Sequence, residues 1–378
     1  MLVFFASLIG GPAPDWRQVY RITVAVGYRL PLGAPGAGLF LKGVGIVMKK
    51  LALLATALAM VSGSALAADL HVKALKAPPP AAFDPWDIAF GSAIMNDYIF
   101  RGVTQSNHKA SVAAYFEPRY NVTKDLQLYV GVSGESISFA NRAAAEIDVY
   151  GGIRPTFGAF AFDFGVWGYL YPGGSCADNV LTGGIPGGGV CAVSTNTIFL
   201  ANGNVMKKDV SFFEGYAKVN YTINDMFQVG ANEFYSPNFL NSGAWGNYAS
   251  ITGKFTAPST TFGSSGVGMY ISGEFGRQWL GTSDAFYAVP GFPNGIPYAD
   301  YNTWNIGIGF TYKVFTLDLR YSDTDLSKGN CNAFTSAFNA SGTTSITPIN
   351  PGGAGSNWCG ATGIVKLSAD LTAMTNLK

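Results

Sequence analysis

The sequence predicts an all-β fold: a transmembrane antiparallel up-and-down β-barrel of about 12 strands, with short periplasmic turns and long extracellular loops. Three observations predict it. From Trp86 onward, segments of roughly ten residues with apolar side chains at every second position recur about a dozen times. Aromatic residues gather at the ends of these segments. Charged residues make up only 12% and the mean hydropathy is +0.20, yet no apolar run approaches the roughly 20 residues that a spanning helix needs.

The segment 315–321 shows the alternation most plainly. Its odd-numbered positions hold Phe, Leu, Leu and Tyr, and its even-numbered positions hold Thr316, Asp318 and Arg320. A period of two places these sets on opposite faces of a strand. Strands that cross a membrane must close into a barrel, because only helices and closed barrels satisfy every backbone group in hydrocarbon. The pattern therefore indicates lipid outside and water inside.

Two segments at the start of the chain precede the predicted barrel. Residues 1–47 contain several prolines and no usable pattern, and we interpret them as unstructured translation upstream of the natural start; a structured extension is the alternative. Residues 48–67 have the features of a secretory signal peptide. They begin with Met48-Lys-Lys, continue with an apolar run from Leu51, and end in Ala-Leu-Ala at Ala67, where we expect cleavage.

The mature chain is expected to start with a periplasmic leader and continue as a single barrel. Residues 68–85 contain three consecutive prolines and lack alternation, which predicts an extended segment. Residues 86–378 form the barrel. Its strands are expected at 86–101, 112–121, 126–135, 145–155, 160–171, 209–222, 226–235, 245–256, 267–279, 302–313, 315–324 and 361–371.

The connections between these strands alternate between short and long. Most of the connections assigned to the periplasm are short, with 257–266 the longest of them, whereas outer connections such as 172–208 and 325–360 are long. Outer-membrane barrels have short periplasmic turns and long outer loops. Both termini are therefore predicted to lie in the periplasm, and the protein in the outer membrane of a Gram-negative bacterium. A soluble β-sandwich would not require this alternation of short and long connections.

The inward faces of the strands carry charges of both signs. The residues predicted to line a pore are Glu146, Asp148, Arg154, Asp163, Glu214, Lys218, Lys254, Glu274, Asp318, Arg320, Lys366 and Asp370. The formal net charge of only +1 gives no support to nucleic-acid binding, which would need a basic stripe or patch.

The four cysteines fall in two long outer loops. Cys176 and Cys191 share one loop, and Cys331 and Cys359 share another. An oxidising envelope favours disulfides, and pairing within each loop is the expected connectivity, with free thiols as the alternative. No metal site is expected, because no histidine lies nearby and no short cysteine spacing suits zinc.

One motif carries a resemblance to a known family. The segment 96–106 reads NDYIFRGVTQS, and the motif residues are Asn96, Asp97, Tyr98, Phe100, Arg101, Gly102, Gln105 and Ser106. Further matching segments occur at 167–173, 214–216 and 320–325. The chain resembles the TorF-family porins, also described as the Gcw_chp family of proteobacterial outer-membrane proteins, over most of residues 86–371. The resemblance implies an outer-membrane barrel of porin type and supplies no catalytic residues.

The same motif also has a physical interpretation. We expect Tyr98 and Phe100 in the outer aromatic girdle, with Arg101 and Gly102 turning the chain out of the membrane. Arg101 is then an interfacial anchor of its strand. The alternative is that Arg101 binds lipopolysaccharide phosphates or a permeating anion.

Nothing in the sequence favours an enzyme. The two histidines are His71, in the leader, and His108, near Ser106 in a short loop. A general base needs a fixed serine and an orienting partner at hydrogen-bond distance, which this spacing does not supply. The segment from Asp323 resembles the start of a calcium loop but lacks the glutamate that such a loop requires. We expect neither catalytic residues nor cofactors.

The favoured hypothesis is therefore passive diffusion of small polar solutes or ions through a channel. Eight strands leave an interior that side chains fill and sixteen leave an open one, so twelve predict a narrow pore. The alternative is a closed barrel that acts as a surface adhesin or receptor through its long loops. Expected partners are outer-membrane lipid, lipopolysaccharide, small polar solutes and the barrel-assembly machinery, without nucleic acid; the oligomeric state is left open.

Overall fold

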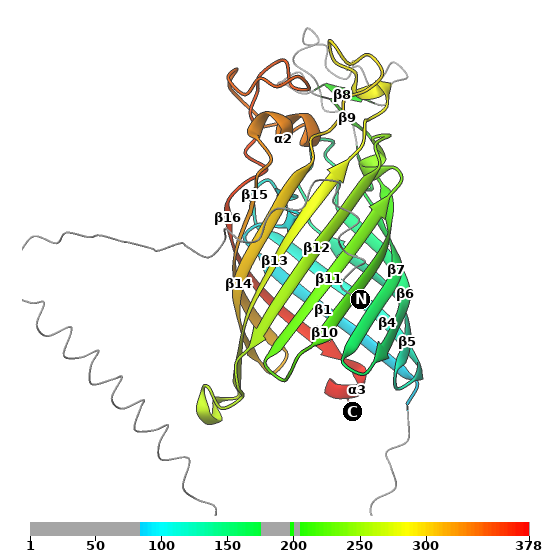
Figure 1. Cartoon of the computed structure of the whole chain (residues 1–378), viewed down its shortest axis with the longest axis vertical. Helices are drawn as coiled ribbons and strands as arrows, with labels where there is room; N and C mark the ends of the chain where they lie inside the picture. Colours follow the sequence, from blue (N-terminus) through cyan, green and yellow to red (C-terminus); the bar gives the residue numbers. More distant parts are fainter. Residues whose placement is uncertain (1–83, 175–196, 200–204, 378) are drawn as a thin grey trace, which may run out of the picture. The chain divides into compact units, whose positions relative to one another are not determined.

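A computed structural model describes residues 84–174, 197–199 and 205–377. The predicted upstream segment (1–47) and signal peptide (48–67) lie outside these residues, as does the leader up to residue 83. In the described part, twelve strands form one closed barrel (Figure 1). In order around the wall they are β1 (Trp86–Met95), β16 (Thr362–Thr372), β15 (Phe315–Thr324), β14 (Tyr301–Tyr312), β13 (Val267–Leu280), β12 (Gly246–Thr256), β11 (Phe227–Ser236), β10 (Phe212–Thr222), β7 (Phe160–Leu170), β6 (Glu146–Phe157), β5 (Leu126–Glu135) and β4 (Ser111–Thr123).

Antiparallel pairing closes the wall. β1 pairs with β4 on one side and with β16 on the other, so no strand edge is left open. The predicted fold class is confirmed, and β5 and β15 have the predicted bounds. The first strand is the clear exception. It ends at Met95 and not at residue 101, because the chain leaves the wall there.

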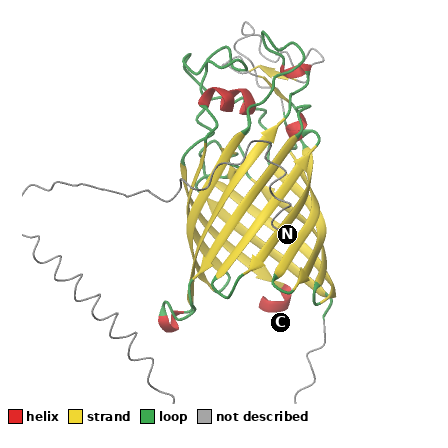
Figure 2. Ribbon diagram, in the orientation of Figure 1, coloured by secondary structure: helices red, strands yellow, loops and turns green. Residues whose placement is uncertain are grey.

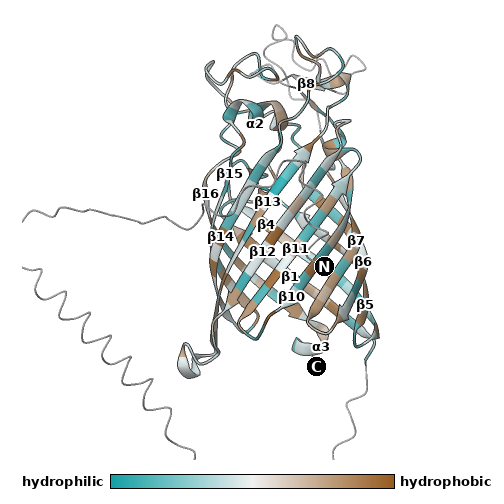
Figure 3. Ribbon diagram, in the orientation of Figure 1, coloured by the Kyte–Doolittle hydropathy of each residue, from teal (hydrophilic) through white to brown (hydrophobic). Residues whose placement is uncertain are grey.

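The two faces of the wall differ in polarity, as the alternation predicts. Apolar side chains such as Ile306 and Phe213 point outward and are 59% and 54% exposed, whereas Glu214, next to Phe213, is buried inside. Brown and teal positions alternate along the strands in Figure 3. An apolar outer band around a closed barrel is the architecture of outer-membrane proteins. The chain is thus an outer-membrane β-barrel.

The two ends of the barrel also differ (Figure 2). One end has short turns and the four-residue helix α3 (Ala373–Asn376), and the other carries long loops with α2 (Lys328–Thr335) and the short strands β8 (Thr197–Phe199) and β9 (Val205–Lys207). Short 3-10 helices lie at η4 (Phe239–Asn241), η5 (Gly263–Ser265) and η6 (Ala285–Tyr287). Among the described residues, no helix has the length and apolar character needed to span a membrane.

The long loops pack into an apolar cap. Phe239, Tyr298 and Trp358 from the loops are buried in one cluster with Tyr169 and Tyr301, which face inward from the outer ends of wall strands. This cluster continues from the loops into the mouth of the barrel. The cap therefore covers the outer mouth.

One disulfide joins the ends of the last long loop. Cys331, in α2, bonds to Cys359, close to the start of β16. This confirms the pairing predicted within that loop. Cys176 and Cys191 lie outside the described residues, so their pairing stays a prediction.

Polarity on the outer face can be tested at Ile306. An Ile306→Arg substitution places a charge on the lipid side in the middle of β14, which costs about 2–4 kcal/mol near the bilayer midplane. Urea unfolding in lipid vesicles should show a loss of this size in the free energy of unfolding. Thr252→Arg, on the inward face of β12 and linked by register through Glu274 to Asn305 beside Ile306, is the matched control and should lose much less; equal losses would contradict the assigned faces.

Candidate functional site: an inward hairpin above a charged lumen

The chain leaves the wall at Asn96, directly after β1. The Asn96 amide nitrogen Nδ2 donates to the carbonyl of Gly363 (2.9 Å), and its Oδ1 accepts from the backbone nitrogen of Val365 (2.6 Å). This side chain therefore replaces the backbone pairing that β1 would have made with β16. Its two hydrogen bonds satisfy backbone groups of β16 at the position where the chain leaves the wall.

The departing chain forms a tight hairpin. Its two short strands are β2 (Ile99–Phe100) and β3 (Val103–Thr104), joined by Arg101 and Gly102. Both turn residues have positive φ, 47° and 78°, as the central positions of a type I′ hairpin turn require. Glycine adopts such angles freely, whereas an arginine there is held in a sparsely populated conformation. Such strain persists only where the surroundings fix the residue.

Asp97 organises the base of the hairpin. Its carboxylate accepts hydrogen bonds from Thr104 Oγ1 (2.5 Å) and Ser106 Oγ (3.0 Å), and it lies 2.6 Å from His108 Nδ1. The other ring nitrogen of His108 is 2.8 Å from the carbonyl oxygen of Asn357. Asp97 thus joins the two arms of the hairpin, because it precedes the turn whereas Thr104 and Ser106 follow it.

Arg101 reaches across the lumen from the tip of the hairpin. Its guanidinium donates to both carboxylate oxygens of Glu214 in β10 (2.9 and 2.7 Å) and to Oε1 of Gln278 in β13 (3.0 Å). The Arg101 and Glu214 side chains are 5% and 0% exposed. Between β10 and β13 lie β11 and β12, and β11 stands diametrically opposite β1 in the strand order. The hairpin therefore spans the barrel interior.

Aromatic rings surround the same guanidinium. Its Cζ lies 4.4 Å from the ring centre of Tyr248, 4.5 Å from that of Phe100 and 4.9 Å from that of Phe234. Rings at these distances attract a cation through their quadrupoles. A planar guanidinium between rings and a bidentate carboxylate is a contact that lysine could not reproduce.

The structure corrects the interpretation of this motif. Arg101 is not an interfacial anchor, Gly102 does not turn the chain outward, and Tyr98 and Phe100 do not stand in the lipid girdle. The segment runs into the lumen because Arg101 finds its carboxylate partner on the far wall, while Gly102 packs against Thr303 of β14.

A cavity of about 330 Å³ lies against the hairpin. Phe100 and Arg101 line it from the hairpin, and Lys218, Glu274 and Arg320 are among the wall residues. Arg320 bonds to Asp318 (3.0 Å) and Asn305 (2.5 Å). Lys218 forms no salt bridge with any described residue, and its Nζ lies 4.6 Å from the ring centre of Tyr216. The space is therefore polar and carries both signs of charge.

A second group of charges lies closer to the short-turn end. Arg154 in β6 pairs with Glu117 in β4 (2.7 Å) and with Asp163 in β7 (3.2 Å), and Glu117 also accepts from Arg119 (2.6 Å). These pairs join strands around the inside of the wall. They leave the lumen lined by ions at this level as well.

All twelve charged residues proposed from the sequence lie on the inward face of the wall. The structure joins some of them in ion pairs: Glu214, Arg154, Asp163, Asp318 and Arg320. Others form no salt bridge within the described residues: Lys218, Lys254, Glu274, Lys366 and Asp370. Sequence reasoning missed Gln278, Tyr248, Glu117 and Glu135. Gln278 could have been predicted, because it lies four residues after Glu274 in the same strand and therefore faces inward as well.

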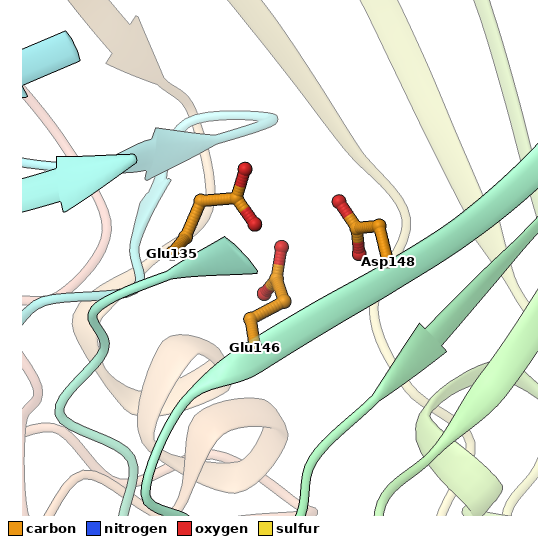
Figure 4. Close-up of side chains that lie close together, drawn as sticks. All are labelled: Glu135, Glu146 and Asp148. Carbon is orange, nitrogen blue, oxygen red and sulfur yellow. The ribbon is translucent and has the colours of Figure 1, made fainter. Parts of the chain in front are cut away.

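The remaining two, Glu146 and Asp148, lie beside Glu135 at the outer end of the wall (Figure 4). Ligand oxygens of the three carboxylates lie within 4.8 Å of one another. Tyr98 of the hairpin donates its hydroxyl to Glu146 Oε1 (2.6 Å), and Tyr171 donates to Oε2 (3.0 Å). Burial beside Glu146 raises the pKa of Tyr98 well above its usual value, so its hydroxyl stays protonated as a donor.

The fold and site define an outer-membrane barrel with a hairpin inside its mouth. Residues 80–187 match the Gcw_chp family model, which is described as a bacterial protein of unknown function. The resemblance to this family is thereby confirmed over that range, and the TorF designation is not tested. No curated protein matches the chain.

Several solved structures are similar in fold. An outer-membrane channel from Pseudomonas putida shows a TM-score of 0.37 and 10% identity, over 78% of this chain and 98% of that one. LpxR from Salmonella typhimurium has a TM-score of 0.35 and 9% sequence identity, and the match covers 75% of this chain and 99% of that one. The toluene transporter TodX from Pseudomonas putida has a TM-score of 0.33 and 11% sequence identity, and the match covers 77% of this chain and 89% of that one.

Removal of the acidic partner tests the buried pair. Glu214→Gln leaves the Arg101 guanidinium buried without its counter-ion, which costs about 3–5 kcal/mol in such sites. Chemical unfolding followed by tryptophan fluorescence should show this loss. Asp125→Asn breaks an exposed pair with Lys124 and should change stability by less than about 1 kcal/mol. A Glu214→Gln variant as stable as this control would mean that the pair does not hold the hairpin.

Proposed function

We propose that the protein is an outer-membrane channel for small polar solutes or ions, closed at rest by the hairpin Asn96–Ser106. The observation that carries this proposal is the Arg101–Glu214 pair, which fixes the hairpin across a lumen lined by charge. Movement of the hairpin away from the far wall would open the channel.

The charged interior supports a conducting role. A twelve-stranded wall encloses more space than its own side chains need to fill, and this one keeps a polar cavity beneath the hairpin. The twelve inward charged residues, from Glu146 to Asp370 along the chain, are proposed to line the path. A polar solute could pass from one ion pair to the next along the lumen. No charged side chain would then be left without a partner in the closed space.

The hairpin is suited to move because the wall does not depend on it. The pairing of β1 with β4 begins at Met95 and Ser111, and that of β1 with β16 begins at Met95 and Lys366. Residues 96–110 are therefore an insertion between two paired strands. Their displacement breaks the contacts of Arg101 and Tyr98 and the backbone contacts of Val103 and Thr104 with the cap, but it leaves the ladder from Met95 downward intact. A mobile element on a rigid frame is the general design of a gate.

The packed cap favours a second candidate, a closed barrel that binds a surface partner through its loops. Phe239, Tyr298 and Trp358 bury the loops against one another over the mouth. In that case the lumen would stay closed even without the hairpin contact. Deletion of loop segments would then abolish binding of the partner and leave permeability unchanged.

An enzymatic role is not proposed. Both ring nitrogens of His108 face oxygen atoms, of Asp97 and of Asn357, and Ser106 donates to Asp97 and not to the histidine. The arrangement lacks a hydroxyl that the imidazole could activate. Contacts with lipopolysaccharide and with the barrel-assembly machinery are part of the proposal for an outer-membrane protein.

Planar-bilayer recordings test the channel hypothesis. Wild-type protein should conduct poorly, whereas Arg101→Ala releases the tip of the hairpin and should raise the mean conductance several-fold. Arg277→Ala is the matched control, because it removes the same side chain from a 40% exposed position that pairs with Asp300. Its conductance should equal that of wild type. A folded Arg101→Ala barrel that conducts no better than wild type would support the closed adhesin instead.

A further inference from the structure

We propose that Glu135, Glu146 and Asp148 bind one divalent cation, with calcium as the preferred ion, at the outer end of β5 and β6. This site goes beyond the proposed channel and does not depend on it. Sequence analysis did not predict this site, because the three residues do not match any calcium-loop spacing.

Strand register brings the three carboxylates together. Glu135 and Glu146 are direct cross-strand partners at the ends of β5 and β6, and Asp148 follows two residues later on the same inward face. Like charges opposite each other in a sheet are destabilising. Glu146 and Asp148 are also only 2% and 4% exposed, so water can screen little of the repulsion. The arrangement needs a compensating positive charge.

That charge does not come from the described part of the protein. None of the three carboxylates forms a salt bridge with a described lysine or arginine. Asp148 Oδ2 accepts from Ser133 (2.9 Å), whereas Asp148 Oδ1 and Glu135 Oε2 are buried and have no hydrogen-bond partner among the described residues. Figure 4 shows the three groups turned toward one another. Buried oxygens without a hydrogen-bond partner, in a carboxylate cluster whose ligand atoms lie within 4.8 Å of one another, are what a bound cation would satisfy.

The donor set selects the class of ion. All the ligands are oxygens, which suits hard cations and not zinc or copper. Oxygens on opposite sides of calcium lie up to about 5.2 Å apart, given bonds of about 2.3–2.6 Å, whereas around magnesium they lie about 4.2 Å apart. Three protein carboxylates whose ligand atoms lie within 4.8 Å of one another can all bind one calcium ion, whereas magnesium usually takes one or two carboxylates and keeps several waters, so calcium is the preferred ion. Tyr98 and Tyr171 donate to Glu146 from outside and orient it as a ligand.

The site also lies at the base of the hairpin. Tyr98, which donates to Glu146, is separated from the turn residue Arg101 by only two positions. A cation bound to Glu146 would therefore stabilise the same part of the chain that Asp97 organises. Calcium should make the outer end of the wall and the hairpin more rigid together.

Calorimetric titration with calcium chloride tests the proposal on refolded, detergent-solubilised full barrel that has been stripped with a chelator and is free of lipopolysaccharide. Wild type should bind one ion per chain with a Kd of about 10⁻⁴–10⁻³ M. Asp148→Asn and Glu146→Gln should each weaken binding at least tenfold. Both variants remove a like charge and should fold without calcium. Asp225→Asn, in an exposed periplasmic turn, is the charge-matched control and should bind as wild type does.

Thermal unfolding gives a second readout. Calcium should raise the unfolding temperature of wild type and of Asp225→Asn but not of the two site variants. Absence of any calcium effect on wild type up to about 10 mM, as expected if the cluster holds protons, would overturn the proposal. Unchanged affinity in the site variants would do the same, and equal or tighter binding of magnesium would overturn the choice of calcium.

Discussion

The buried ion pair between Arg101 and Glu214 is the contact on which the interior of this barrel depends. An arginine inside a barrel must find a counter-ion, and this one finds it on the opposite wall. The pair holds the hairpin across the lumen, and the hairpin supports the cap. The backbone nitrogen of Thr104 donates to the carbonyl of Trp358, and Val103 pairs with Cys359, which the disulfide ties to α2. The outer loops are therefore organised around a segment that lies inside the barrel.

The wall and the hairpin are stabilised by different kinds of contact. The wall is closed by backbone hydrogen bonds and presents apolar side chains to lipid, so it resists change as a unit. The hairpin is instead held to the wall by side-chain contacts of Tyr98 and Arg101, with Asp97 joining its two arms, and to the cap by backbone contacts. Breaking these contacts costs a few kcal/mol and leaves the wall ladder in place. A rigid wall with a separately held hairpin is what the proposed gating needs.

The wall could be predicted from the sequence and the hairpin could not, for a physical reason. Period-two alternation fixes which residues face lipid, so β5 and β15 were placed with the observed bounds, and Glu214 was placed inside. Tyr98 and Phe100 keep the even-numbered register of Ile88, Phe90 and Ile94, so the aromatic positions did not mark the departure of the chain from the wall. The partner of Arg101 lies 113 residues away. Glu135 was missed because its role depends on strand register, which brings it opposite Glu146.

The most direct test of the account is to tether the hairpin to the wall in a barrel whose ion pair has been removed. A Cβ at position 102 would lie 3.3 Å from that of Thr303, close to the 3.5–4.5 Å range of disulfides, but only 2.8 Å from that of Thr324, so the tethered variant also carries Thr324→Gly to make room. Single-channel recordings would compare Arg101→Ala carrying Gly102→Cys, Thr303→Cys and Thr324→Gly under oxidising and reducing conditions, with Arg101→Ala plus Thr324→Gly as control for the native disulfide. We expect conductance when the tether is reduced and closure when it forms. Equal conductance in both states, with the tether verified by mass spectrometry, would contradict the hairpin as the gate.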